Sequence, residues 1–155
     1  MKALVIYDSV FGNTEKIAQA MGQALGSQAI RVGDVRAEHL AGLDVLIVGS
    51  PTRAFSPTPA IKNWLKSLAA NSLKGVKVAA FDTRIALADV NSRILPAFVK
   101  VFGYAAEPIG KQLTKKGGTQ ALSPEGFFVN GSEGPLKDGE LDRAADWAKQ
   151  FATTA

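Results

Sequence analysis

Residues 4–17, LVIYDSVFGNTEKI, join a short apolar run to a polar turn and then to the start of a helical pattern. The run at residues 3–7 has the length and the β-branched side chains of a buried strand. In the helical pattern, apolar residues recur at core-facing spacing, at Ile17, Ala18, Met21 and Leu25. A strand, a polar turn and a helix N-terminus in this order can form a phosphate site, because the first N–H groups of a helix are unpaired and its dipole favours an anion.

The turn itself carries groups that suit a phosphate. Ser9 and Thr14 offer hydroxyls, Asn13 offers an amide, and Gly12 lets the main chain come close to a ligand. An ordinary strand-to-helix turn, capped by the same serine, asparagine and threonine, explains the pattern equally well without any ligand. On these residues alone, both interpretations stay open.

Composition limits the chemistry that the chain can perform. Its 155 residues are 46% apolar and 21% charged, which suits one soluble domain, residues 1–155, with a single core. No apolar run reaches the roughly 20 residues of a membrane helix, and no signal-peptide pattern precedes the first strand, so we expect a cytoplasmic protein. The chain has no cysteine, and its one histidine, His39, cannot form a histidine-rich site, so we predict no metal.

The charge of the chain is modestly basic, with a net charge of +4 and a pI near 9.4. The lysines and arginines are spread along the sequence, and only Lys115 and Lys116 are adjacent. We therefore predict no nucleic-acid partner, while the excess charge could steer an acidic protein or an anionic small molecule.

Strands and helices alternate along the whole chain. We expect strands at residues 2–7, 28–32, 43–49 and 76–81, and a fifth at 119–122 and 127–129 that is interrupted at 124–126. We expect helices at residues 13–25, 59–68, 105–113 and 140–151, a short or broken helix within 85–102, and a polar connection at 34–42. This alternation predicts an α/β fold, a three-layer α/β/α sandwich around a parallel sheet.

Three unusual loops leave the expected strands, at residues 8–14, 50–59 and 82–89. The second is rich in proline, and none resembles a minimal connection. If the first strand is central, the three loops converge at the carboxyl edge of the sheet, where ligands bind in such folds.

Several motifs of the chain resemble those of a known family. The sequence YDSVFGNTE at residues 7–15 is similar to the phosphate-binding loop of flavodoxins, and VGSPTR at 48–53 resembles their second flavin loop. Further along, GFFV at 126–129, EGPL at 133–136 and GEL at 139–141 look like the tail of bacterial flavodoxin-domain proteins. The resemblance covers the whole chain.

The resemblance implies a flavodoxin-like, five-stranded parallel sheet of order 2-1-3-4-5 and non-covalent FMN. The phosphate would lie in residues 9–14, and the flavin ring between residues 51–55 and 82–85. The implied function is a low-potential electron carrier, in which the chemistry belongs to the flavin. The cofactor-binding residues are then Ser9, Val10, Phe11, Gly12, Asn13, Thr14, Ser50, Pro51, Thr52, Arg53, Ala54, Phe55, Asp82, Thr83 and Arg84.

The part of the expected site that would hold the flavin ring departs from the family pattern. Flavodoxins commonly stack a tryptophan and a tyrosine on the flavin, but here the second loop offers only Phe55 and the third has no aromatic residue. The second loop also lacks the glycine that often follows its aromatic residue. Arg53 and Arg84 stand where flavodoxins are usually acidic, and we hypothesise that they make the reduction potential of the flavin less negative. The alternative is that both arginines face solvent or bridge surface carboxylates.

Two residues invite a catalytic interpretation that the sequence does not support. Asp82 could act as a general base, but a role in capping the loop or in bonding a flavin edge fits better, since no partner His or Cys forms a triad with it. Ser9 has no neighbour that could activate it as a nucleophile, so we predict no catalytic residue. The apolar residues of 85–102 could cover the flavin, meet a partner or form a dimer contact, and packing on their own domain is the commoner outcome.

Three functions remain in competition. The first is an FMN electron carrier that docks with a reductase and an acceptor protein as a monomer or weak homodimer. The second is an NAD(P)H-dependent quinone or flavin reductase of the flavodoxin-like type, and the third is a flavin-free interaction module. A phosphorylation receiver domain is excluded, because it needs an Asp at the end of the third strand, where this chain has Ser50.

Overall fold

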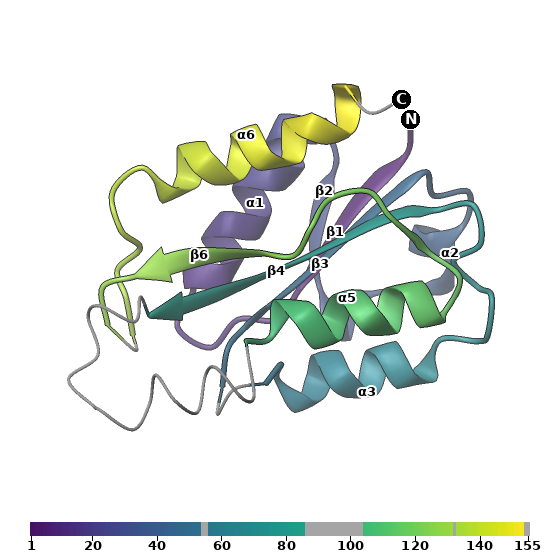
Figure 1. The fold of residues 1–155 in the computed structure, drawn as a ribbon, viewed down its shortest axis with the longest axis horizontal. Helices are drawn as coiled ribbons and strands as arrows, with labels where there is room; N and C mark the ends of the chain where they lie inside the picture. Colours follow the sequence, from purple (N-terminus) through teal and green to yellow (C-terminus); the bar gives the residue numbers. More distant parts are fainter. Residues whose placement is uncertain (54–55, 86–103, 132, 154–155) are drawn as a thin grey trace.

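A parallel sheet lies between two layers of helices (Figure 1). The computed structural model describes residues 1–53, 56–85, 104–131 and 133–153. The strand order is 2-1-3-4-5, as predicted, and every pairing is parallel. The strands are β1 (Ala3–Tyr7), β2 (Gln28–Arg31), β3 (Val45–Pro51) and β4 (Lys77–Ile85), with β5 (Thr119–Gln120) and β6 (Glu125–Val129) sharing the fifth position.

The helices form two pairs, one on each face of the sheet. Helices α1 (Asn13–Leu25) and α6 (Glu140–Thr153) cover one face, while α3 (Pro59–Ser67) and α5 (Ala106–Lys115) cover the other (Figure 1). The short helix α2 (Ala37–Leu40) and a 3-10 turn (Val32–Asp34) follow β2. None of the helices in the described part of the chain has the length and apolar character of a membrane span.

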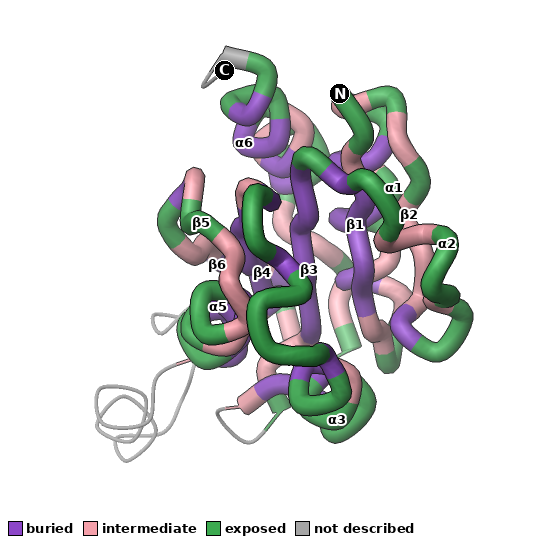
Figure 2. The backbone as a smooth tube through the Cα atoms, turned by 90° about the vertical axis from the view of Figure 1, so that its right-hand side faces the viewer, coloured by how far each residue is buried: buried purple, intermediate pink, exposed green. Residues whose placement is uncertain are grey.

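Alternate residues of each central strand face opposite layers, which divides the core in two. Leu4 and Ile6 pack with the side chains of α3 and α5, whereas Val5 and Tyr7 pack with those of α1 and α6. Figure 2 shows the central strands as the most buried part of the backbone. Strands buried on both faces explain the near-continuous apolar runs seen in the sequence.

Several expectations about the elements were wrong. Strand β3 continues to Pro51, and β4 continues to Ile85, so that Asp82, Thr83 and Arg84 lie on a strand rather than in a loop. Polar residues fit this buried strand because they bond to one another and to neighbouring elements. The break in the fifth strand precedes Glu125 instead of spanning 124–126, since β6 begins there and pairs with β4. The connection at 34–42 contains α2. The short helix expected within 85–102 falls almost entirely outside the described residues.

An ion pair between the buried Glu140 and the partly exposed Arg143 fixes β6 to α6. Glu140 accepts hydrogen bonds from the Phe128 N–H at 2.7 Å and from Arg143, which also donates to the carbonyl of Gly126. Burial alone would raise the pKa of the Glu140 carboxyl, but these hydrogen bonds outweigh it and the pKa is lowered. The carboxyl end of β6 is thereby held beside β4, at the edge where the candidate site lies.

Candidate functional site

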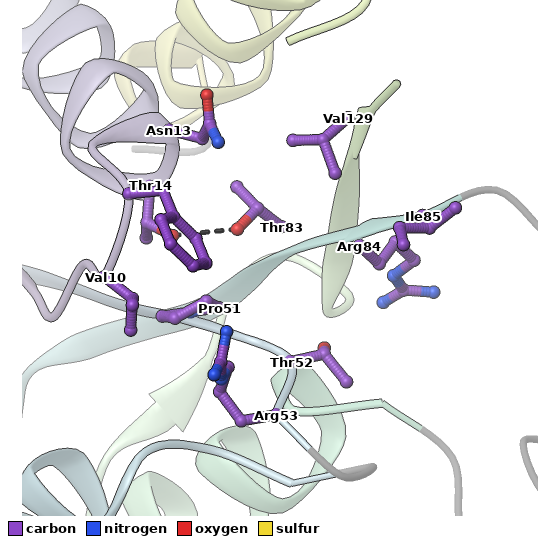
Figure 3. Close-up of a pocket in the computed structure, with 11 residues that line it drawn as sticks. Val10, Asn13, Thr14, Pro51, Thr52, Arg53, Thr83, Arg84, Ile85 and Val129 are labelled. Carbon is purple, nitrogen blue, oxygen red and sulfur yellow. Dashed lines mark hydrogen bonds between the residues drawn. The ribbon is translucent and has the colours of Figure 1, made fainter. Parts of the chain in front are cut away.

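The ends of β1, β3, β4 and β6 surround a pocket at the carboxyl edge of the sheet (Figure 3). Its volume is about 100 Å³. It lies where the fold predicts a ligand site, beside the point at which the strand order reverses. Its walls are formed by Val10, Phe11, Asn13, Thr14, Pro51, Thr52, Arg53, Thr83, Arg84, Ile85 and Val129.

One end of the pocket is the N-terminus of α1. Gly12 precedes the helix with a φ of 92°, and nothing lies within 4 Å of the position that a Cβ would take there. Ser9 Oγ accepts from the Gly12 N–H at 3.1 Å and from the Glu15 N–H at 3.4 Å. Within the described parts of the chain, four further main-chain N–H groups of this turn have no protein acceptor, those of Val10, Phe11, Asn13 and Thr14. The turn therefore presents several free donors at the positive end of a helix dipole.

Two contacts across the fold hold this turn in place. The hydroxyls of Thr14 and Thr83 lie 2.8 Å apart, and both residues are buried, so the start of α1 is joined to β4 (Figure 3). The Asn13 amide donates to the Glu133 carbonyl at 3.1 Å. The following residue, Gly134, has a φ of 99°, and a Cβ there would come within 2.6 Å of the Asn13 side chain. Only glycine lets the 133–134 turn approach so closely.

A charged cluster supports the turn from the side of β2. The Arg31 guanidinium contacts Asp8 Oδ1 at 3.2 Å, the Ser9 carbonyl at 3.0 Å and Glu15 Oε2 at 3.3 Å. The Tyr7 hydroxyl donates to Glu15 at 3.0 Å, and burial followed by this hydrogen bond raises the pKa of the phenol. Sequence reasoning missed Arg31, since nothing local marks an arginine on an edge strand as the partner of a loop over 20 residues away.

The opposite end of the pocket is built on an ion pair. Asp82 is fully buried, and its two oxygens accept from Nε and Nη2 of Arg84 at 2.6 Å each. The Ala106 N–H, at the start of α5, donates to the same carboxylate at 2.9 Å. Burial raises the pKa of the Asp82 carboxyl, against the opposing effects of the guanidinium and this N–H. Asp82 thus caps α5 and orients Arg84, and it does not line the pocket.

Arg84 is confined on its other sides as well. Its guanidinium carbon lies 3.6 Å from the centre of the Tyr104 ring, a cation–π arrangement. A Cβ on Gly126 would lie 2.2 Å from the arginine, so this glycine leaves the space that the side chain occupies. The alternative that Arg84 faces solvent or a surface carboxylate is therefore wrong, because its partner is a buried one.

The segment after β3 contributes Thr52 and Arg53. The Thr52 N–H donates to the Thr83 carbonyl at 3.0 Å, and Thr52 Oγ1 accepts from the Ala105 N–H at 3.2 Å. The Arg53 guanidinium lies 5.6 Å from the centre of the Phe11 ring. Two main-chain hydrogen bonds join Arg53 and Ser56. Ala54 and Phe55, both expected at the flavin, lie outside the described residues.

The predicted site residues divide into two groups. Nine line the pocket together: Val10, Phe11, Asn13, Thr14, Pro51, Thr52, Arg53, Thr83 and Arg84. Four others, Ser9, Gly12, Ser50 and Asp82, lie next to lining residues in the sequence without lining the pocket themselves. Ser50 is fully buried, and its hydroxyl accepts from the Thr58 N–H at 3.0 Å and donates to the Pro51 carbonyl. Val129 lines the pocket without having been predicted, since an apolar strand residue carries no signal of a site, whereas Ile85 ends the segment 82–85 that was expected beside the flavin ring. The described residues contain no cluster of three or more His, Asp or Glu side chains able to hold a metal ion.

Comparison with known proteins agrees with this fold. The family model described as the flavodoxin domain matches residues 4–124. The fold is similar to that of a flavodoxin from the domain Archaea, with a TM-score of 0.74 and 22% identity over 99% of this chain and 97% of the other. Oxidised flavodoxin 1 from Bacillus cereus gives a TM-score of 0.75 and 16% identity over 99% and 98% of the two chains. Flavodoxin 2 from the same organism gives 0.73 and 21% over the full length of both chains.

Proposed function

Because the chain belongs to the flavodoxin domain family, we propose that it binds FMN and carries electrons between redox partner proteins. The observation that carries this proposal is the turn before α1. Its free main-chain N–H groups, at a helix N-terminus on the carboxyl edge of a parallel sheet, suit the phosphate of FMN.

The α1 end of the pocket suits the phosphate of FMN without any basic side chain. Gly12 leaves open space beside the free N–H groups, so the main chain can approach an anion directly. Ser9 and Thr14 supply hydroxyls, and the contacts of Thr14 with Thr83 and of Asn13 with Glu133 fix the turn before a ligand arrives. A site organised in advance loses less entropy on binding.

The ring end would take the flavin against Pro51, Thr52 and Arg53 on one side and against β4 on the other. The pocket is smaller than the roughly 300–1,000 Å³ of typical ligand sites, so we expect rim side chains to move aside on binding. Phe11 and Arg53 are the candidates, because Phe11 is 47% exposed, Arg53 is exposed as well, and both line the pocket.

Bound FMN would supply reversible one-electron chemistry. The chain's own residues would bind it, orient it and set its electrostatic surroundings. Asp82 is committed to Arg84 and to the Ala106 N–H, so it is not free to accept a substrate proton. This arrangement favours an electron carrier over a quinone reductase that needs a general acid or base.

Titration of the apoprotein with FMN and with riboflavin tests this proposal. We expect FMN to bind at least about 100-fold more tightly than riboflavin, because only FMN carries the phosphate for the α1 turn. Absorbance and flavin fluorescence give both affinities. Equal affinities would contradict the assignment of the phosphate end, and no binding of either would favour a flavin-free module. Rapid steady-state oxidation of NAD(P)H with a quinone would instead indicate the reductase.

A further inference from the structure

A second concavity lies between α3 and α5, on the face of the sheet opposite α1 and α6. It has a volume of about 270 Å³ and a mostly apolar surface. The two helices that form its walls run side by side (Figure 1). Its lining consists of Pro57, Lys62, Leu65, Lys66, Pro108, Lys111 and Gln112. We refer to these seven residues as the α3–α5 groove.

Lysines border the α3–α5 groove on both sides. Lys62 and Lys66 are one turn apart on α3, and Lys111 stands on α5, with Lys115 one turn further on; all four are exposed. Among the residues that the structure describes, none of these four has a carboxylate within ion-pair distance. Their charges are therefore available to a partner.

The basic character of the chain is concentrated on this face. Residues 58–76 and 104–118 contain six lysines and one acidic residue, Glu107, a net charge of +5, whereas the whole chain carries +4. Residues 133–153, which include α6, contain five acidic and three basic residues, a net charge of −2. The net charges on the two faces of the sheet thus have opposite signs, and this difference would orient an approaching charged protein.

We propose that the α3–α5 groove docks an acidic amphipathic helix of a partner protein. Its apolar face would pack on the exposed Pro108 and on the apolar parts of the lysine side chains, with the buried Leu65 and Pro57 beneath them, and carboxylates on either side of that face would meet Lys62, Lys66 and Lys111. A helix fits a groove of this kind because its apolar residues recur along one stripe flanked by polar positions. This surface is separate from the pocket at the end of β4, and the proposal does not depend on FMN.

Other occupants match the surface less well. A lipid surface is usually met by protruding apolar side chains, but the exposed large apolar residues of the described chain are Met1, Val10, Phe11 and Leu141, none of which belongs to α3 or α5. Residues 86–103 carry a net charge of +1 and supply one carboxylate, so this segment of the chain does not match the lysines in charge.

Binding of a synthetic helical peptide tests the proposal. The peptide carries leucines at positions i, i+3, i+4 and i+7 and glutamates at the remaining positions. We expect it to shift the NMR amide signals of α3 and α5 in the full chain, and to bind more weakly as salt rises. The charge-reversed variant Lys62→Glu/Lys111→Glu should weaken binding by about tenfold or more. The matched control Lys16→Glu/Lys149→Glu, which changes the same charge at two exposed sites on α1 and α6, should weaken it by less than about threefold.

Four results would overturn the proposal. These are shifts that fall outside α3 and α5, equal weakening by both variants, binding of a scrambled peptide of the same composition with the same affinity, or binding of phosphatidylglycerol vesicles but not of the helix. Sedimentation of the chain alone is the remaining check, since self-association that is lost in Lys62→Glu/Lys111→Glu would assign the groove to a second copy instead. FMN titration of both variants reports separately on the flavin site and shows that each variant is folded.

Discussion

The two ends of the candidate pocket are built from different parts of the chain. At the α1 end, main-chain N–H groups have no protein acceptor among the described residues, and a glycine with positive φ shapes the turn. At the β4 end, a buried ion pair between Asp82 and Arg84 fixes the wall, and Tyr104 packs on the arginine. The first arrangement depends on backbone conformation, whereas the second depends on side chains that must stay paired.

This difference predicts different sensitivities to mutation. A ligand held by main-chain donors tolerates changes of side chain, provided that the backbone keeps its conformation. A charge that is buried with one partner is costly to leave alone, so changes at the β4 end should act mainly on folding stability. Four sets of variants test this contrast, and the expected effect decreases from the first to the last.

The largest effect is expected at Asp82. The substitution Asp82→Asn removes the charge that compensates Arg84 and weakens the cap on the Ala106 N–H. We expect the free energy of unfolding to fall by about 3 kcal/mol, as for other broken buried pairs, measured by urea denaturation. The control Asp142→Asn, at an exposed position of α6, should change it by less than about 0.5 kcal/mol. A loss below about 1 kcal/mol for Asp82→Asn would show that Arg84 finds other compensation.

The second largest effect is expected for a substitution at Gly12, and its cause is the backbone conformation alone. A methyl group at Gly12 meets no atom within 4 Å, so Gly12→Ala reports the positive φ alone, at a cost of about 1–2 kcal/mol. Gly33→Ala is the matched control, since that position is equally open and does not have a positive φ. We expect Gly12→Ala to lower both stability and FMN affinity, and Gly33→Ala to lower neither. Equal losses in the two variants would contradict this account of the turn.

The hydroxyl pair between Thr14 and Thr83 couples the two ends of the pocket. Thr14→Val or Thr83→Val alone leaves one buried hydroxyl without its partner, and each should cost about 1–2 kcal/mol of stability. The double variant removes both polar groups and should cost less than the sum of the two. A double-mutant cycle measures this coupling, and strict additivity would mean that the 2.8 Å contact contributes no interaction energy.

The smallest effect concerns the reduction potential of bound FMN. Arg53 is exposed and lacks a carboxylate partner among the described residues. After solvent screening, we expect Arg53→Gln to lower the reduction potential on the order of 40 mV, which corresponds to about 1 kcal/mol for the transfer of one electron. The charge of Arg84 is balanced by Asp82, so Asp82→Asn/Arg84→Gln should change the potential less. Spectroelectrochemistry compares the two variants. The reverse order would show that the ion pair, rather than the free arginine, sets the potential.

The central strands and the turn that suits a phosphate could be predicted because their signals are local, whereas the strand order 2-1-3-4-5 was implied by the resemblance to flavodoxins. Apolar runs of the right length mark the central strands, and the turn at residues 9–14 carries its glycine, its hydroxyls and its helix start within a few positions. Ends of strands were harder to predict. Strand β4 continues through Asp82 and Arg84 because each charge is neutralised by the other, and a sequence pattern counts both simply as polar.

The sequence by itself determined the layers of this protein and the helix start that suits an anion, because these follow from the spacing of neighbouring residues. Only the tertiary structure decided which distant groups meet. It joins Thr14 to Thr83, Asn13 to the 133–134 turn and Asp82 to the first residue of α5. It also places the lysines of α3 and α5 on the rims of one groove. These contacts depend on how the chain crosses between parallel strands, and no local pattern encodes the geometry of those crossings.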